Sequence, residues 1–310
     1  MRRALAALAA LVATAALAAP AAAQAVRGSY LYTLSSFTGP IPYNHSRVAV
    51  DRERNEVYVL YQNTVRVFNE SVMEVYQFGD DLDLGHLVDV AVDDRGDILL
   101  LAWRDGKPAI VRCDYRGRPQ ARSALTGLPD TFSDFAPNRL VFQRGELYLA
   151  SSMGLQVVRA DREGNFLQGY DLFTLFELEE KDRGAVELGG FGVDAAGNIL
   201  LTAPVLFRAF VLAPDGTLSA FGKAGGAPGR FNIAGGITRD SKGNLLVVDK
   251  LKGAVLVFTG RFEFVAQFAA RGYKPGELIY PDDLAIDGRD RVYVTQAGKR
   301  GISVFKLAHL

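Results

Sequence analysis

The stretch 236-GITRDSKGNLLVVD-249 contains the pattern that decides the fold. An apolar start at Gly236-Ile237 leads to Asp240, a polar turn follows over residues 241–244, and a second apolar run covers residues 245–248. Gly243 and Asn244 are residues that supply the positive φ of a tight hairpin turn. The stretch therefore predicts two antiparallel strands joined by a short turn.

The same pattern recurs along the chain at intervals of 42 to 51 residues. Each copy adds a third apolar strand and a further turn followed by a fourth strand, with period-two, β-branched and aromatic composition throughout. Four short strands per unit of roughly 40 to 50 residues are typical of a propeller blade. The copies predict an all-β fold, a six-bladed β-propeller of four-stranded antiparallel blades. Their turns begin at Asp51, Asp93, Gln143 (a degenerate copy), Asp194, Asp240 and Asp287.

The two ends of the repeat region complement each other. The sixth copy stops at residues 305–310, just after its third strand, whereas residues 28–37 form a strand without a blade of its own. An open array of blades would leave two large apolar faces in water. We therefore expect the N-terminal strand to complete blade 6, so that residues 26–310 form one closed domain.

The first 25 residues have the composition of a targeting segment. Arg2 and Arg3 precede an uncharged Ala- and Leu-rich run that ends in small residues, which is typical of a secretory signal peptide cleaved after Ala23 or Ala25. A membrane anchor is the alternative. From residue 26 onward no apolar run approaches the roughly 18 residues of a membrane helix. We expect an exported protein, periplasmic or secreted, without stable membrane insertion after cleavage.

Composition excludes several classes of protein. The 35 basic residues balance the 35 acidic ones, whereas a nucleic-acid binder normally carries a basic surplus. The single cysteine, Cys113, excludes an intramolecular disulfide or a cysteine-cluster metal site, and we expect it to be a buried small hydrophobic residue.

Blades 5 and 6 carry a fuller motif. Residues 221–231, FGKAGGAPGRF, lead to the Asp240 turn, and residues 271–278, RGYKPGEL, lead to Leu284-Ala285-Ile286-Asp287. These linker glycines, the phenylalanine, the proline and the Asp-Gly-Asn turn resemble the NHL repeat, whose propellers are mostly six-bladed. The resemblance implies the architecture of residues 28–310, although the full motif is present in blades 5 and 6 alone. A fold of this kind does not by itself imply an activity.

Two catalytic groups of propellers suggest a metal site as an alternative. Peptide-amidating lyases resemble NHL propellers and hold zinc with three histidines, and here His45 and His86 precede the innermost strands of adjacent blades while His309 is almost terminal. Such a site would lack one ligand. Gluconolactonase-like propellers use an N-terminal Glu, but residues 26–50 contain no acid. His45 and His86 are therefore either metal ligands or two partly exposed loop histidines, and we expect no cofactor.

Aligning the blades gives a second candidate site. The residues four positions before each repeat Asp should line one mouth of the central channel, because the innermost strands surround it. One interpretation is a polarised mouth that binds a polar ligand, with the glycines leaving one side open. The alternative is inter-blade ion pairing that neutralises charges in a narrow channel. In chain order these residues are Arg47, Asp89, Arg139, Gly190, Gly236 and Asp283.

Two connectors flanking blade 3 carry apolar residues that we expect to be exposed. The first contains Phe132 and Phe135, and the second contains Phe173 and Phe176. Apolar loops on a rigid scaffold are a common route to partner binding. The alternative is that these loops fold down and plug the channel mouth.

These observations favour a monomeric, exported, non-catalytic propeller that serves as a binding scaffold for a protein, peptide or glycan partner in the cell envelope. The alternative is a metal-dependent propeller hydrolase or lyase with its site at the central channel. Export and the near-zero net charge disfavour nucleic acid as a partner.

Overall fold

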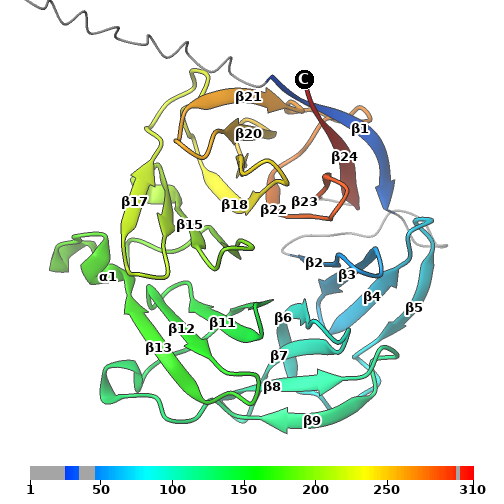
Figure 1. The fold of residues 1–310 in the computed structure, drawn as a ribbon, viewed down its shortest axis with the longest axis vertical. Coiled ribbons are helices and arrows are strands. Elements are labelled where there is room, and N and C mark those ends of the chain that lie inside the picture. Colours follow the sequence, from blue (N-terminus) through cyan, green and yellow to red (C-terminus); the bar gives the residue numbers. More distant parts are fainter. Residues whose placement is uncertain (1–24, 35–45, 298–300) are drawn as a thin grey trace, which may run out of the picture.

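The computed structural model describes residues 25–34, 46–297 and 301–310. These residues form six four-stranded antiparallel sheets, arranged as blades around a central axis (Figure 1). The predicted fold class, an all-β six-bladed propeller, is confirmed. Residues 1–24, which carry most of the predicted signal peptide, lie outside the described residues, as does His45.

The strands follow one another from the inside of each blade to the outside. Blade 1 comprises β2 (Arg47–Asp51), β3 (Glu56–Tyr61), β4 (Thr64–Phe68) and β5 (Glu74–Phe78); blade 2 comprises β6 (His86–Val92), β7 (Ile98–Arg104), β8 (Lys107–Cys113) and β9 (Pro119–Ser123). Blade 3 comprises β10 (Arg139–Gln143), β11 (Glu146–Ser151), β12 (Gln156–Ala160) and β13 (Phe166–Asp171); blade 4 comprises β14 (Gly190–Val193), β15 (Ile199–Ala203), β16 (Arg208–Leu212) and β17 (Leu218–Phe221). Blade 5 comprises β18 (Ala234–Arg239), β19 (Leu245–Asp249), β20 (Ala254–Phe258) and β21 (Phe264–Phe268); blade 6 comprises β22 (Pro281–Ile286), β23 (Arg291–Gln296), β24 (Ile302–His309) and β1 (Val26–Leu34).

Helical segments in the described residues are short. They are η1 (Asp130–Phe132), α1 (Leu172–Leu175), η2 (Glu180–Asp182) and η3 (Pro204–Leu206). In the described part of the chain, no helix has the length and hydrophobicity that crossing a bilayer requires.

Strand β1 completes blade 6, as the sequence predicts. It pairs antiparallel with β24 from Val26 opposite His309 to Leu34 opposite Ile302. Figure 1 shows it as the outer strand of that blade, beside the C-terminal strand. The hydrogen bonds between β1 and β24 therefore join the two ends of the repeat region within blade 6.

The repeat aspartates fix the turn between the first two strands of a blade. Oδ1 of Asp240 accepts hydrogen bonds from the backbone N–H groups of Lys242 at 2.9 Å and Asn244 at 2.8 Å. The same pair of bonds forms at the corresponding turns that begin with Asp93, Asp194 and Asp287.

Blade 3 makes this turn without an aspartate. Arg144 has φ +55° and Gly145 has φ +81°, so both central residues of the two-residue turn lie in the left-handed region. This is the requirement of a type I′ hairpin, which closes through the backbone alone. Gln143 therefore takes the place of the repeat Asp without loss of the turn.

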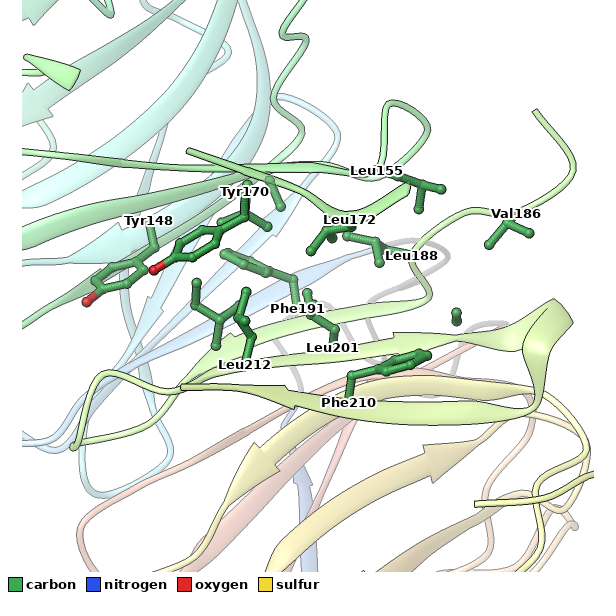
Figure 2. Close-up of a cluster of buried hydrophobic side chains, with 14 residues drawn as sticks. Tyr148, Leu155, Tyr170, Leu172, Val186, Leu188, Phe191, Leu201, Phe210 and Leu212 are labelled. Atoms are coloured by element: carbon green, nitrogen blue, oxygen red, sulfur yellow. The ribbon is translucent and has the colours of Figure 1, made fainter. Parts of the chain in front are cut away.

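Six clusters of buried apolar side chains lie one at each interface between neighbouring blades. Figure 2 shows the cluster between blades 3 and 4, where Tyr148 and Tyr170 lie close to Phe191 and Leu212. A radial sheet buries both of its faces in this way, which explains why the inner strands are almost continuous apolar runs. Cys113 belongs to the cluster between blades 1 and 2 and is buried, as the sequence predicts.

Candidate functional site

The innermost strands of all six blades surround a central cavity of about 330 Å³. This volume lies at the lower end of the range for small-molecule sites, roughly 300 to 1,000 Å³. The cavity wall continues to the repeat-Asp turns, where Arg52, Glu53, Asp94 and Arg144 line it. The cavity therefore extends from the starts of the innermost strands towards the face that carries these turns.

Two layers of residues differ in chemistry. The charged layer is formed by Arg47, Asp89, Arg139 and Asp283, four positions before each repeat Asp, and Asp89, Arg139 and Asp283 line the cavity. The next residue of every innermost strand is apolar and borders the cavity, and we call these six the apolar layer; five of them are at most 8% exposed because their side chains belong to the clusters between blades. The six residues are Val48, Val90, Leu140, Phe191, Ile237 and Leu284.

Backbone irregularities position the two carboxylates. The pairing of β6 with β7 shifts register between Leu87 and Asp89, and the pairing of β22 with β23 shifts between Pro281 and Leu284. A bulge of this kind redirects side chains and is common beside functional sites.

Backbone amides occupy the oxygens of Asp89. Its Oδ1 accepts from the N–H of Val90 at 2.9 Å, and its Oδ2 accepts from the N–H of Leu140 in blade 3 at 2.7 Å. Burial is the largest influence on this carboxyl and raises its pKa to about 6, although Arg47 and Arg139 oppose the shift. Asp89 is thus a buried link between two blades.

Asp283 is in a similar environment. Its Oδ1 accepts from the N–H of Leu284 at 2.9 Å, and burial raises the pKa of the carboxyl despite the nearby charges of Arg47 and Arg139. Of the two arginines, neither forms an ion pair with Asp89 or Asp283 among the described residues.

Most N–H groups of the Arg139 guanidinium have no hydrogen-bond acceptor among the described residues. Its Nη1 donates to the carbonyl of Asn138 at 3.3 Å, and within the described part of the chain this is its one hydrogen bond. A guanidinium carries five N–H donors. Burial, followed by the positive charge of Arg47, lowers the pKa of Arg139. The group nevertheless stays protonated at neutral pH, because the reference pKa of arginine is above 12.

Arg47 pairs outside the charged layer. Its Nη1 lies 3.6 Å from Oδ2 of Asp282, and its buried Nε has no hydrogen-bond partner among the described residues. Asp282 also accepts from Nζ of Lys250 in blade 5. Burial would raise the pKa of Asp282, but Lys250 and Arg47 outweigh it and lower the pKa. Sequence reasoning missed Asp282 and Lys250, although two consecutive acids at the start of β22 were a possible signal.

No ion pair joins two members of the charged layer among the described residues, but Arg47 of blade 1 pairs with Asp282 of blade 6, which is ion pairing between blades of the kind that the alternative expects. The alternation of sign is present, but the carboxylates bond to backbone amides and Arg47 bonds to Asp282.

The glycines of this layer do not leave one side open, contrary to expectation. A Cβ on Gly190 would lie 2.4 Å from the carbonyl oxygen of Gly235, and a Cβ on Gly236 would lie 2.7 Å from Oδ1 of Asp283. These distances are shorter than real Cβ contacts, so both glycines allow the backbones of blades 4, 5 and 6 to approach closely.

The described residues do not supply a cluster of His, Cys, Asp or Glu for the metal site that the alternative requires. No group of three or more His, Cys, Asp or Glu in them could hold a metal ion. His86 is exposed at the start of β6, and His309 bonds to Asp290 at 3.2 Å on blade 6. The described residues therefore offer no three-histidine zinc site, and His45 lies outside them.

The connector phenylalanines pack against the blades. Phe132 and Phe135 are 7% and 6% exposed and belong to the cluster between blades 2 and 3, so the expectation that they are exposed is wrong. The space for Phe132 is made by Gly169, whose Cβ would lie 2.3 Å from the ring.

The second connector is half-buried. Phe176 stacks on Phe210 with ring centroids 4.0 Å apart, and Arg183 lies over the ring of Phe173 at 4.1 Å. Both phenylalanines pack against the cluster between blades 3 and 4, to which Leu172 of α1 also belongs (Figure 2). Neither connector plugs the cavity, since none of these four phenylalanines lines it.

Comparison with known proteins supports the architecture. A family profile described as a 6-bladed beta-propeller, DUF5128, matches residues 236–310. No curated protein matches the sequence. The chain is a six-bladed β-propeller.

Solved structures with the same fold have different titles and low sequence identity. An auxiliary nutrient binding protein from Bacteroides thetaiotaomicron is 13% identical with a TM-score of 0.62, covering 92% of this chain and 77% of that chain. A gluconolactonase from Xanthomonas campestris is 17% identical with a TM-score of 0.58, covering 93% and 92%. Virginiamycin B lyase from Staphylococcus aureus is 12% identical with a TM-score of 0.56, covering 92% and 100%. At these identities the likeness concerns the fold alone.

Proposed function

We propose that this chain is a non-catalytic binding module that holds a polar ligand in its central channel. The observation that carries the proposal is Arg139, which lines a cavity of about 330 Å³ and whose guanidinium makes one hydrogen bond among the described residues. The side chain is half-buried, and the negative charges of Asp89 and Asp283 act on it without accepting hydrogen bonds from its N–H groups among the described residues. A ligand that accepts these N–H groups would form charge-assisted hydrogen bonds with the guanidinium.

The proposal also includes the localisation of the protein and the source of its ligand. We infer export to the periplasm or the cell exterior from the N-terminal segment, and a protein, peptide or glycan of the cell envelope as the source of the ligand. Blades 5 and 6 are proposed to be NHL-type, since the same linker loop recurs in both: Ala224 bridges Phe231 in one and Arg271 bridges Leu278 in the other.

A metal-dependent hydrolase or lyase is the competing function, and the fold neighbours include a gluconolactonase and a lyase. The described residues provide no three-ligand cluster to support it. A binding role needs no such cluster and uses Arg139, which lines the cavity.

The experiment is a thermal-shift screen of purified protein against a panel of sugars, peptides and organic acids. We expect at least one compound to raise the Tm of the wild type and of Arg118→Gln, an exposed arginine on an outer turn of blade 2. The same compound should leave the Tm of Arg139→Gln unchanged. Stabilisation that persists in Arg139→Gln, or lactone hydrolysis that depends on an added divalent metal, would contradict the proposal.

A further inference from the structure

Arg139 and Asp283 lie on opposite sides of the channel. Each innermost strand is next to that of the following blade, and β22 is next to β2, so blade 3 faces blade 6 across the axis (Figure 1). Arg139 belongs to blade 3 and Asp283 to blade 6, and both line the central cavity at the level of the charged layer. The cavity therefore has a positive and a negative side chain on facing walls.

We infer that the channel binds a small zwitterion of the amino-acid type, with its carboxylate on Arg139 and its ammonium group on Asp283. This inference rests on the proposed binding function and names the class of ligand for the same cavity.

Neighbouring residues hold the carboxylate of Asp283 in place. The N–H of Asp283 donates to Oγ1 of Thr295 at 2.9 Å, and the same hydroxyl donates to the carbonyl of Asp283 at 3.3 Å. Oδ1 accepts the N–H of Leu284, which leaves Oδ2 without a hydrogen-bond donor among the described residues. Oδ2 is therefore a positioned acceptor that an N–H group of a ligand can use.

The unpaired atoms of both side chains are accessible. Nε of Arg47 is unpaired and fully buried, whereas no atom of Arg139 or Asp283 is both unpaired and fully buried among the described residues. Arg139 donates one N–H to the carbonyl of Asn138, and no ion pair joins it to Asp283 in the described part of the chain. A molecule in the cavity can therefore reach unpaired atoms on both walls.

The charges of the layer favour a ligand that carries both signs. Two arginines and two aspartates form the layer, so its formal charge is zero when all four are ionised. Asp89 has a pKa of about 6 and is largely ionised at neutral pH, but both of its oxygens accept backbone N–H groups. An anion alone would gain Arg139 and meet the two carboxylates. A zwitterion leaves the total charge unchanged and forms charge-assisted hydrogen bonds at both ends.

The environment of Asp283 responds to a ligand of this kind. Burial is the largest influence on its pKa and raises it, whereas the charges of Arg47 and Arg139 lower it. An ammonium group of a ligand would act in the same direction as the two arginines, because an opposite charge nearby favours the ionised form. The ligand would therefore offset part of the effect of burial on this carboxylate.

The cavity volume limits the size of the ligand. A volume of about 330 Å³ corresponds to roughly ten water molecules at about 30 Å³ each. An amino acid of up to roughly nine non-hydrogen atoms fits this space. The cavity wall continues to the repeat-Asp turns at Arg52 and Arg144, so the ligand would reach the two charges from that face.

The first test is isothermal titration calorimetry of the whole protein with four zwitterions of increasing length: glycine, β-alanine, 4-aminobutyrate and 6-aminohexanoate. Because Arg139 and Asp283 belong to facing walls, we expect one site per chain and an affinity that peaks at one length, about tenfold or more above that of the weakest zwitterion. Affinity that does not depend on length, or the absence of binding by all four, would overturn the inference.

Singly charged analogues of the best-binding length test whether both charges are needed. For 4-aminobutyrate these are butyrate, which lacks the ammonium group, and butylammonium, which lacks the carboxylate. We expect each analogue to bind about tenfold or more weakly than the zwitterion, since each loses one charge-assisted contact. An analogue that binds as tightly as the zwitterion would overturn the inference, and this comparison needs the wild type alone.

Two variants assign the ends of the ligand. Asp283→Asn should weaken binding of the zwitterion about tenfold or more without weakening the carboxylate analogue, whereas Arg139→Gln should weaken the zwitterion without weakening the ammonium analogue. The matched controls Asp134→Asn and Arg118→Gln, both at exposed positions, should leave all affinities unchanged. A variant that weakens all three probes equally, or that leaves the zwitterion unaffected, would overturn the inference.

Arg139→Lys tests the same point if Arg139→Gln fails to fold. It keeps the positive charge and loses the planar fork that matches a carboxylate, and we expect zwitterion binding to weaken several-fold. Unchanged binding of the zwitterion by this variant would contradict the placement of the carboxylate on Arg139.

The failure of this inference is distinct from failure of the proposed function. If no zwitterion binds but another compound of the thermal-shift panel stabilises the protein through Arg139, the zwitterion assignment is overturned and the binding function stands. If no compound of either set depends on Arg139, both are overturned.

Discussion

Oδ2 of Asp89 in blade 2 accepts a hydrogen bond from the backbone N–H of Leu140 in blade 3 at 2.7 Å. The bond ties two innermost strands together at the layer where the channel is charged. It also fixes the carboxylate beside Arg139, the residue that precedes Leu140 in β10. Asp89 and Leu140 both line the cavity, so this hydrogen bond holds blades 2 and 3 together at the candidate site.

The raised pKa of Asp89 makes stability depend on pH. Its pKa is about 6 in the folded protein and 3.8 in the reference state, so the folded state holds the proton to higher pH. Unfolding then releases a proton between about pH 4 and pH 6, and the stability contributed by the protonated group is lost as the pH rises through the folded pKa. We expect the free energy of unfolding of wild type minus that of Asp89→Asn to fall by about 3 kcal/mol between about pH 4 and pH 7.

Urea unfolding of both proteins at several pH values measures this difference. Asp134→Asn, at an exposed position of the first connector, is the matched control and should give a flat difference. A wild-type minus Asp89→Asn difference that is flat or rises with pH would contradict the burial of this carboxyl.

The close approach of blades 5 and 6 predicts a glycine-specific effect. In Gly236→Ala the new Cβ would lie 2.7 Å from Oδ1 of Asp283 and 2.8 Å from Cδ2 of Leu284, so the blades must move apart. Overpacking of this kind costs about 1–3 kcal/mol. Gly226→Ala, where no atom lies within 4 Å of the new Cβ, should be neutral, and thermal melts compare the two. Equal Tm values for the two variants would show that the innermost strands are not in tight contact.

The closure of the ring predicts different effects at two leucines of β1. Leu34 is 1% exposed and packs in the cluster between blades 6 and 1, whereas Leu31 is 44% exposed on the same strand. We expect Leu34→Ala to lower the free energy of unfolding by about 2–5 kcal/mol and Leu31→Ala to change it by about 0.5 kcal/mol or less. Urea denaturation measures both. Similar small effects would mean that β1 does not stabilise the closed ring.

The turn aspartates predict another pair of effects. Asp240→Ala leaves the backbone N–H groups of Lys242 and Asn244 without their acceptor, at a cost of about 1–3 kcal/mol. Gln143→Ala, at the corresponding position of blade 3, should cost less, because that turn closes through its own left-handed backbone. A cost for Gln143→Ala equal to that of Asp240→Ala, measured by the same denaturation, would contradict this difference.

Much of the fold follows from the sequence because each blade repeats the same local signals. The Asp-Gly-Asn turns and alternating strands recur, and the unmatched strand at residues 28–37 predicts the pairing of β1 with β24 that the structure has. Three of the four charged residues that the sequence singles out, Asp89, Arg139 and Asp283, line the cavity, since position relative to the repeat Asp determines distance along an innermost strand.

The contacts across blades were not predictable in the same way. The bond from Leu140 to Asp89 and the Lys250–Asp282–Arg47 chain join residues of different copies, and no feature of a single copy encodes them. The burial of Phe132 depends on Gly169, a glycine in an outer strand that looks unremarkable in the sequence. Composition of a connector does not reveal whether it folds back onto its blade.

The central claim is that Arg139 is the ligand-binding group of the channel. Proton–nitrogen NMR spectra of the arginine Nε–H groups, during titration with the compound that raises the Tm most in the thermal-shift screen, test it most directly, with Arg139→Lys providing the assignment of Arg139. The account predicts that the Arg139 signal shifts and saturates while the signal of Arg118 stays in place. A signal of Arg139 that does not move while exposed arginines shift in proportion to the concentration of the compound would contradict it.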